Sequence, residues 1–80
     1  MLKENVQKVH TTDLGARRIK RNLGLRGDLI EWCKELILDD STQIVRHGKN
    51  YYVQAKGCVL TINASSYTII TAHKTNGRWE

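Results

Sequence analysis

The 80-residue sequence contains no proline, and it has no apolar run of about 18 residues, the length that a helix needs to span a bilayer. Without proline, the chain must reverse direction mainly at its six glycines. The first residues are polar and carry no apolar stretch typical of a secretory signal. We therefore expect a cytoplasmic protein that makes no membrane contact.

Cysteine is also scarce. Cys33 and Cys58 each lie among apolar residues, where a reduced thiol behaves as a small buried side chain. A disulfide between them is geometrically possible but is disfavoured in a reducing compartment. The three histidines, at positions 10, 47 and 73, are too scattered for a zinc motif. The sequence predicts neither a metal site nor a cofactor.

Acidic residues are missing from two long stretches of the chain. Residues 14–27 contain five cations and no acid, and residues 41–79 contain five more cations, again without an acid. Five of the eight acids fall between Asp28 and Asp40. A charge separation of this kind favours a polyanionic partner over a neutral small molecule. A solvated basic face without a partner is the alternative.

The first half of the chain has the periodicity of helices. Residues 2–9 predict a short first helix, and Thr11 or Thr12 can cap a second helix that ends near Gly24. A third helix begins at Asp28. The residues expected to face the core are Leu2, Val6 and Val9 in the first helix, Leu14, Ile19 and Leu23 in the second, and Leu29, Ile30, Cys33, Leu36 and Ile37 in the third.

The second half predicts four short strands, over residues 42–46, 51–55, 58–64 and 67–74, joined by tight turns. Such strands form an antiparallel meander. With the helices first and the strands after, the expected fold is α+β, with N-terminal helices packed on one face of a four-stranded antiparallel sheet. We expect a single domain over residues 1–80, with helices over about 2–40, the sheet over about 42–74 and a frayed tail over 75–80.

Alternation along the strands predicts which side chains face the helices. Leu60, Ile62, Ile70 and Ala72 are expected on the covered face. The opposite face should then be open and should carry Thr61, Asn63, Tyr67, Ile69, Thr71 and His73, with Arg46, His47 and Lys49 at one end of the sheet. Hydroxyl, amide and cationic groups suit phosphate binding, although a polar sheet face often meets only solvent.

The missing acids also restrict the chemistry. No carboxylate lies between Ser41 and Trp79, so a metal-dependent nuclease built on sheet carboxylates is excluded. Metal-free cleavage through a neighbouring 2′-hydroxyl restricts the substrate to RNA and needs a proton acceptor, a proton donor and cations. His73 or His10 could move the protons, and the charge could come from Arg18, Arg46, Lys49 or Lys74. For either histidine a purely structural role is an equal alternative.

Three segments are similar to those of a small bacterial family of unknown function: HTTDLG at residues 10–15 with RIKRNL at 18–23, GKNYYV at 48–53, and INASSYTIITAHK at 62–74. More remotely, the chain resembles the ribonuclease toxins of the RelE and barnase–colicin type. Those toxins pair N-terminal helices with a curved four-stranded sheet and cut RNA without metal. This resemblance implies a catalytic residue near the end of the last strand, at Thr71 or His73.

Three functions are compatible with these observations. The first is a metal-independent endoribonuclease of toxin type, blocked by an acidic antitoxin-like protein, with catalytic candidates His73, His10, Arg46 and Thr71. The second is a non-catalytic nucleic-acid-binding module with tyrosines stacked on bases. The third is a small interaction protein with an acidic partner. The residues expected to contact nucleic acid are Arg17, Arg18, Lys20, Arg21, Lys49, Thr61, Asn63, Tyr67 and Lys74.

Overall fold

The computed structural model describes residues 2–55 and 57–74, so the frayed tail expected at 75–80 lies outside the described residues. In chain order the elements are a 3₁₀ helix η1 (Lys3–Lys8), helices α1 (Asp13–Leu23) and α2 (Leu29–Leu38), and strands β1 (Gln43–His47), β2 (Asn50–Ala55), β3 (Cys58–Asn63) and β4 (Ile69–Lys74). The α+β fold with helices before strands is therefore confirmed.

Capping residues set the ends of the two α-helices. The Thr12 side chain accepts a hydrogen bond from the Gly15 amide and begins α1, and Gly24 ends it in the left-handed conformation at φ 66°. The Asp28 carboxylate accepts from the amides of Ile30 and Glu31 and begins α2. The first helix is correctly located but adopts 3₁₀ geometry, with a non-helical Asn5 inside it.

One expected core residue of α1 is wrong. Leu14 is 58 % exposed, whereas Ile19 and Leu23 are buried. Successive helix residues are rotated by about 100°, so Ile19 and Leu23 share a face, while Leu14 lies about 140° away from Ile19. The exposed Leu14 therefore belongs to the outer surface of α1.

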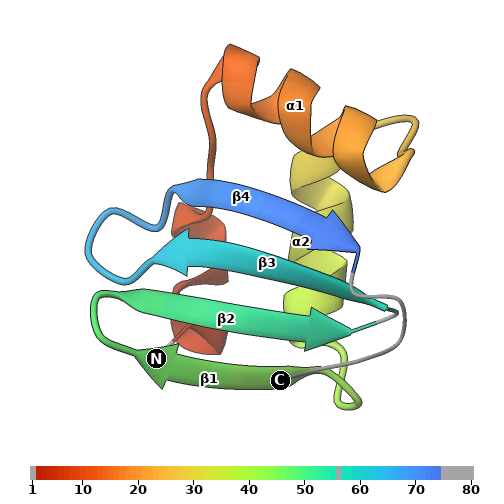
Figure 1. Cartoon of the computed structure of the whole chain (residues 1–80). Helices are drawn as coiled ribbons and strands as arrows, with labels where there is room; N and C mark the ends of the chain where they lie inside the picture. Colours follow the sequence, from red (N-terminus) through yellow and green to blue (C-terminus); the bar gives the residue numbers. More distant parts are fainter. Residues whose placement is uncertain (1, 56, 75–80) are drawn as a thin grey trace.

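The four strands form one antiparallel sheet in the order β1-β2-β3-β4 (Figure 1). The β1–β2 register pairs Ile44 with Val53 and Arg46 with Tyr51, and the β2–β3 register pairs Tyr51 with Ile62 and Val53 with Leu60. Opposite residues share a face, so these residues all lie on the side that meets the helices. Residues such as Val45, Tyr52 and Thr61 lie on the other side.

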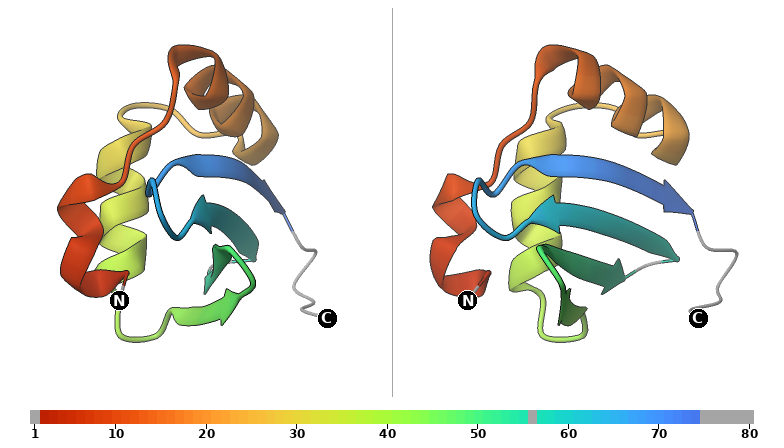
Figure 2. Two further views of the ribbon diagram at one scale, coloured as in Figure 1. Left: turned by 90° about the vertical axis from the view of Figure 1, so that its left-hand side faces the viewer. Right: turned by 60° about the vertical axis from the view of Figure 1, so that its left-hand side comes forward.

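The helices do not all lie on the sheet in the same way. α2 and η1 cover one face, while α1 runs beside β4 at the edge of the sheet (Figures 1 and 2). The core between these layers contains Leu2, Val6, Val9, Ile19, Leu23, Leu29, Cys33, Leu36, Ile37, Val53, Leu60, Ile62, Ile69 and Ala72. In the described part of the chain, no helix is long and apolar enough to cross a membrane.

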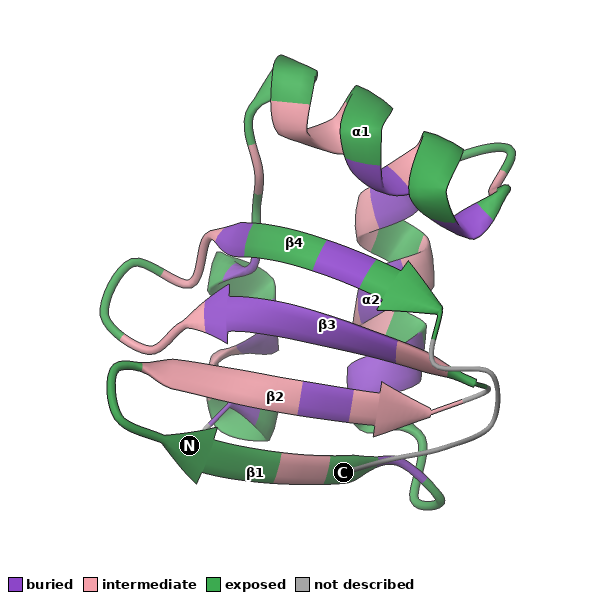
Figure 3. Cartoon of the chain, viewed as in Figure 1, coloured by how far each residue is buried: buried purple, intermediate pink, exposed green. Residues whose placement is uncertain are grey.

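The predicted faces of β4 are partly wrong because the strand contains a bulge. Thr61 pairs with Thr71 and Ile62 with Ile69, so Ile70 is an extra residue with no partner in β3. As a result Ile69 is buried at 2 % exposure and Ile70 is 51 % exposed, the reverse of the expectation, while Ala72 is buried as expected. Ile70 and Thr71 are exposed between the buried Ile69 and Ala72, and Figure 3 shows this exposed stretch of β4 between two buried ones.

The loop before β4 also departs from the prediction. Tyr67 has a positive φ of 59°, a left-handed conformation that an extended strand does not adopt. The strand therefore begins at Ile69 rather than at Tyr67. This turn brings the Thr68 side chain next to the segment that leads into α1.

Candidate nucleic-acid interface

One side of α1 carries four residues that we call its outer stripe: Leu14, Arg17, Arg18 and Arg21. All four are exposed, and they lie on the side of the helix opposite Ile19 and Leu23. Within residues 2–55 and 57–74, none of the three arginines contacts a carboxylate. The stripe therefore presents three arginines that form no ion pair with the described residues.

A groove of about 550 Å³ lies between α1 and β4. Its lining combines Arg18 and Asn22 of α1 with Thr68, Ile70 and Thr71 of the last strand and its loop. Leu14 and Ile70, two of the large apolar side chains that the structure leaves exposed, also line it. The groove therefore offers a cation, hydroxyl groups and apolar surface side by side.

Hydrogen bonds to the outer edge of β4 hold the groove together. The Thr11 hydroxyl donates to the Ile69 carbonyl at 3.2 Å, and the Asn22 amide donates to the Ala72 carbonyl at 3.4 Å. The Ile69 amide donates to the His10 carbonyl at 2.8 Å. These contacts satisfy backbone groups that an edge strand would otherwise leave unpaired, and they fix α1 relative to β4.

The contact between α1, with the segment that leads into it, and the edge of β4 is the seam of the structure. Gly15 permits a close approach at this seam. A Cβ atom at this position would lie 2.6 Å from Thr11 Oγ1 and 3.0 Å from Thr12 Oγ1. Both hydroxyls are engaged, the first with Ile69 and the second with the Gly15 amide. The glycine therefore leaves space for two hydrogen bonds that position the start of α1.

A chain of side-chain hydrogen bonds adjoins one end of the groove. His10 Nδ1 lies 2.8 Å from the Lys8 carbonyl oxygen, and His10 Nε2 lies 3.2 Å from Thr68 Oγ1. Thr68 Oγ1 in turn lies 2.8 Å from Ser66 Oγ, which donates to Asn63 Oδ1 at 3.3 Å. Because a carbonyl oxygen only accepts, His10 Nδ1 carries a proton and Nε2 is the nitrogen free to gain or lose one.

Both charge states of His10 are compatible with this chain. In the neutral ring, Thr68 donates to Nε2 and Ser66 donates to Thr68. In the charged ring, Nε2 donates to Thr68, Thr68 donates to Ser66, and Ser66 donates to Asn63. The two arrangements therefore differ in the direction of the His10–Thr68 and Thr68–Ser66 hydrogen bonds, and only the second leaves the Ser66 hydroxyl free to donate to Asn63.

The structure brings some of the predicted residues together. Arg18 and Thr71 line the groove, and His10 reaches it through Thr68. Arg17 and Arg21 lie on the adjacent outer stripe, while Lys20 is half-buried beside it. These residues form one continuous candidate surface along α1 and the start of β4.

Other predicted residues lie elsewhere. His73 is five residues beyond Thr68 along β4, or about 16 Å in an extended strand, and Lys74 follows it. Arg46 belongs to β1, at the opposite edge of the sheet and about 14 Å away from β4. It also lies on the helix-covered side, with its guanidinium 5.4 Å from the centre of the Tyr51 ring.

The remaining predicted residues have local roles or restricted access. Thr61 is only 8 % exposed, so it does not form the open surface expected of it. The Asn63 side chain accepts hydrogen bonds from the amides of Ser65 and Ser66 and stabilises their turn. Tyr67 packs beneath Lys8, whose amine lies 5.6 Å from the ring centre, and the Lys49 carbonyl accepts from the Ala64 amide.

Sequence reasoning missed Thr68, Thr11 and Asn22, which line the groove. The sequence could have indicated Asn22, because it follows Arg18 by four residues and therefore lies on the same side of a helix. Thr11 and Thr68 lack a local signal, since only the pairing of segments 58 residues apart brings them to the site.

Burial changes the pKa of one cysteine thiol outside the groove. Desolvation raises the pKa of the Cys33 thiol to about 12. Cys33 is buried in the core beneath the sheet, and Cys58 is half-buried, with no disulfide between them. The thiol of Cys33 is thus a structural group rather than a nucleophile.

Comparison with known proteins gives a family but no biochemical activity. Residues 3–73 match the family described as "Protein of unknown function (DUF3781)". No curated protein and no solved structure matches the chain. The match spans the groove, the outer stripe of α1 and all of the core except Leu2. The chain therefore belongs to the DUF3781 family.

Proposed function

We propose that this protein binds single-stranded RNA through the outer stripe of α1 and the adjoining groove along β4. The observation that carries the proposal is the set of three exposed arginines, which contact no carboxylate in the described residues and adjoin the groove. Arginine side chains suit phosphate because the guanidinium group can donate two parallel hydrogen bonds.

The apolar side chains favour a single strand over a duplex. A single strand exposes its bases, which can pack against Leu14 and Ile70 while its phosphates meet the arginines. A duplex would present only phosphates and sugars to this surface, and the apolar side chains would gain nothing. RNA is the expected form because its single-stranded loops and ends commonly present splayed bases to proteins.

The experiment is a salt titration of binding to a fluorescein-labelled 12-nucleotide single-stranded RNA, followed by fluorescence polarisation. Substitution of Arg17→Gln together with Arg21→Gln should reduce the slope of log K against log salt concentration by about 1.4, since each phosphate contact on a single strand contributes about 0.7. The double change Lys3→Gln and Lys34→Gln removes the same charge from the helix layer and should leave the slope unchanged.

Apolar contacts can be tested separately from charge. Substitution of Leu14→Ser with Ile70→Ser should weaken binding several-fold without changing the salt slope, since covering apolar side chains with bases contributes about 25 cal/mol per Å² of apolar surface buried. Equal losses in the helix-layer control would refute the proposed surface. Equal affinity for a duplex of the same length would refute the single-strand preference, and a DNA strand of the same sequence tests the preference for RNA.

A second candidate is metal-independent cleavage of the bound RNA, and the hydrogen-bonded His10 favours it. Its Nδ1 is fixed by the Lys8 carbonyl, and its Nε2 faces a hydroxyl that lines the groove. In this mechanism the proton of the 2′-hydroxyl passes through the Thr68 hydroxyl to His10 Nε2, and the 2′-oxygen attacks the phosphorus. The bond from phosphorus to the 5′-oxygen then breaks, the departing 5′-oxygen takes a proton from water, and Arg18 stabilises the charge that develops on the phosphate. The products would be a 2′,3′-cyclic phosphate and a 5′-hydroxyl.

This candidate is tested with purified protein, a defined RNA and excess EDTA. Cleavage should persist in EDTA, disappear in His10→Ala and survive in the matched variant His73→Ala. Intact RNA with the wild-type protein, or loss of cleavage only in His73→Ala, would refute a catalytic role for His10.

A further inference from the structure

The two edges of the sheet differ in how their backbone groups are satisfied. At β4, the segment from His10 to Thr11 and the Asn22 side chain supply hydrogen bonds to the outer edge. β1 is the other edge strand, and among the described residues nothing pairs with its outer side. Four of its five residues are exposed. The described residues thus close one edge of the sheet and leave the other open to an added strand.

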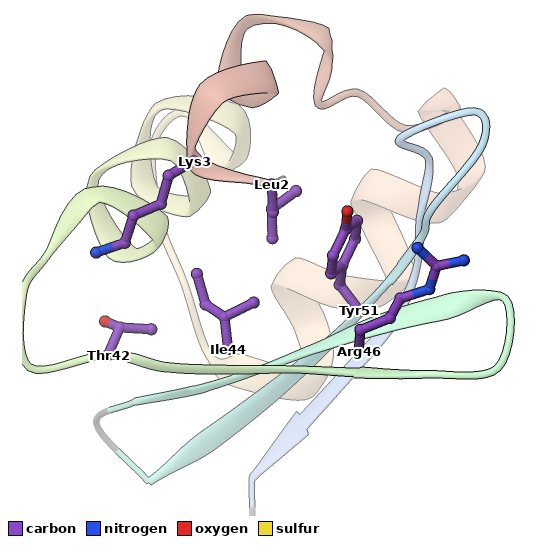
Figure 4. A pocket seen from close by; sticks show the side chains of 6 residues that line it. All are labelled: Leu2, Lys3, Thr42, Ile44, Arg46 and Tyr51. Atoms are coloured by element: carbon purple, nitrogen blue, oxygen red, sulfur yellow. The ribbon is translucent and has the colours of Figure 1, made fainter.

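A pocket of about 550 Å³ lies directly above the open strand, on the helix-covered side. Figure 4 shows Leu2, Ile44 and Tyr51 in its centre, with Lys3 and Arg46 at opposite ends. Thr42 also lines it, but its hydroxyl is engaged by the Leu36 carbonyl at 2.6 Å. Between the two cations, the pocket is therefore mainly apolar.

The two cations are available for a partner's acidic groups. Lys3 is exposed and contacts no carboxylate among the described residues. Arg46 donates through Nε to the Gly48 carbonyl at 2.8 Å and lies over the Tyr51 ring, which fixes its orientation. Its two terminal nitrogens have no hydrogen-bond partner in the described part of the chain. A guanidinium held in this way can bind a carboxylate with little loss of side-chain entropy.

We propose that the open edge of β1 binds an extended acidic peptide segment of another protein as a fifth strand. One apolar side chain of the segment enters the pocket, and acidic side chains two residues before and after it meet Lys3 and Arg46. Alternate residues of a strand share a face, so this acidic–apolar–acidic spacing matches a pocket with a cation at each end. Backbone pairing supplies affinity and the pocket supplies specificity.

Two other roles for the open strand fit the structure less well than an acidic segment does. One is an edge that only prevents aggregation, and the other is a dimer formed through β1. Charged residues on an edge strand can simply prevent aggregation, but that role needs no adjacent apolar pocket. A second copy of the chain would pair β1 with its own β1. The Arg46 and His47 side chains would then face a strand that carries the same residues and no acid. The net charge of +5 also opposes association between copies. An acidic segment is the partner that satisfies both the cations and the pocket.

This proposal does not depend on RNA binding, because β1 and the groove lie at opposite edges of the sheet. The probe is a capped nine-residue peptide with leucine at its centre, glutamate two residues before and after it, and threonine elsewhere. Binding is followed by the amide chemical shifts of the ¹⁵N-labelled protein. We expect saturable shifts concentrated in residues 43–47 and at Lys3.

N-methylation of the peptide distinguishes strand addition from other contacts. Only alternate amides of an added strand face β1, so methylation of that set should abolish binding, while methylation of the other set should leave it within about twofold. A peptide with glutamine in place of both glutamates should bind more weakly. Arg46→Gln should weaken the acidic peptide about two- to fivefold, as expected for a surface ion pair.

Lys49→Gln is the matched control, because it removes the same charge from the adjacent turn but outside the pocket. It should leave peptide affinity unchanged, and thermal melting should show that both variants remain folded. Equal binding of the two N-methylated peptides, or of the acidic and glutamine peptides, would overturn the proposal. So would shifts that avoid β1, or sedimentation showing that the protein alone dimerises through residues 43–47.

Discussion

Substitution of Gly15→Ala should destabilise this protein, although alanine is normally the better helix former. In an unobstructed helix the change would stabilise by up to about 1 kcal/mol. Here the new Cβ would lie 2.6 Å from Thr11 Oγ1, which is closer than real Cβ contacts occur, and 3.0 Å from Thr12 Oγ1. Threonine is stiff about χ1, so Thr11 must leave the rotamer that bonds Ile69.

The magnitude follows from the bonds that are disturbed. Loss of the Thr11–Ile69 hydrogen bond costs about 1 kcal/mol, and weakening of the Thr12 cap costs about 1 kcal/mol more. Together these losses exceed the helix-propensity gain, so we expect a net loss of about 1 kcal/mol in the free energy of unfolding. Urea unfolding, followed by tryptophan fluorescence, measures the change.

A double-mutant cycle with Thr11→Ala isolates the clash. Thr11→Ala removes the oxygen at 2.6 Å, so Gly15→Ala in that background should be neutral or stabilising. The two changes should therefore couple by about 1–2 kcal/mol. If Gly15→Ala alone stabilises the protein by about 1 kcal/mol and the two changes add, the close approach at this seam is refuted.

Two further predictions test the bulge and the core. Ile69→Ala should cost about 2–5 kcal/mol of stability because Ile69 is fully buried, whereas the matched change Ile70→Ala should cost less than about 0.5 kcal/mol; equal losses in urea unfolding would contradict the bulge. The pKa of the Cys33 thiol is about 12 in the folded protein and 9.0, the ordinary value, in the unfolded chain. Between these two pH values the unfolded chain loses the thiol proton and the folded protein keeps it. The contribution of the protonated thiol to the free energy of unfolding is fully present below pH 9. It is lost as the pH rises, by about 1.4 kcal/mol between pH 8 and 10. Cys33→Ala should remove that part of the pH dependence, and an unchanged dependence in the variant would refute it.

Most of the fold was predictable because its local signals agree. Thr12, Gly24 and Asp28 mark helix ends through side-chain and backbone chemistry that acts within a few residues. Helices before strands then determined the α+β class. The faces of β4 were not predictable, since a bulge at Ile70 depends on the partner strand and leaves no mark in the alternation.

The candidate site was only partly predictable for the same reason. The cations of α1 are contiguous in the sequence, so their common surface follows from helix geometry. The contact of His10 with Thr68 depends on an isolated pairing of distant segments. The tyrosine at position 67 was expected on a strand, and its left-handed backbone reflects a turn that its residue type does not favour.

The seam between α1 and β4 also has a consequence for the order in which the protein folds. All three strand pairings join neighbours in the chain, whereas the bonds from Thr11 to Ile69 and from Asn22 to Ala72 close loops of 58 and 50 residues. Long loops close late because their closure costs more chain entropy. A ligand in the groove binds only after this last step, so it should lengthen the lifetime of the folded state against proteolysis.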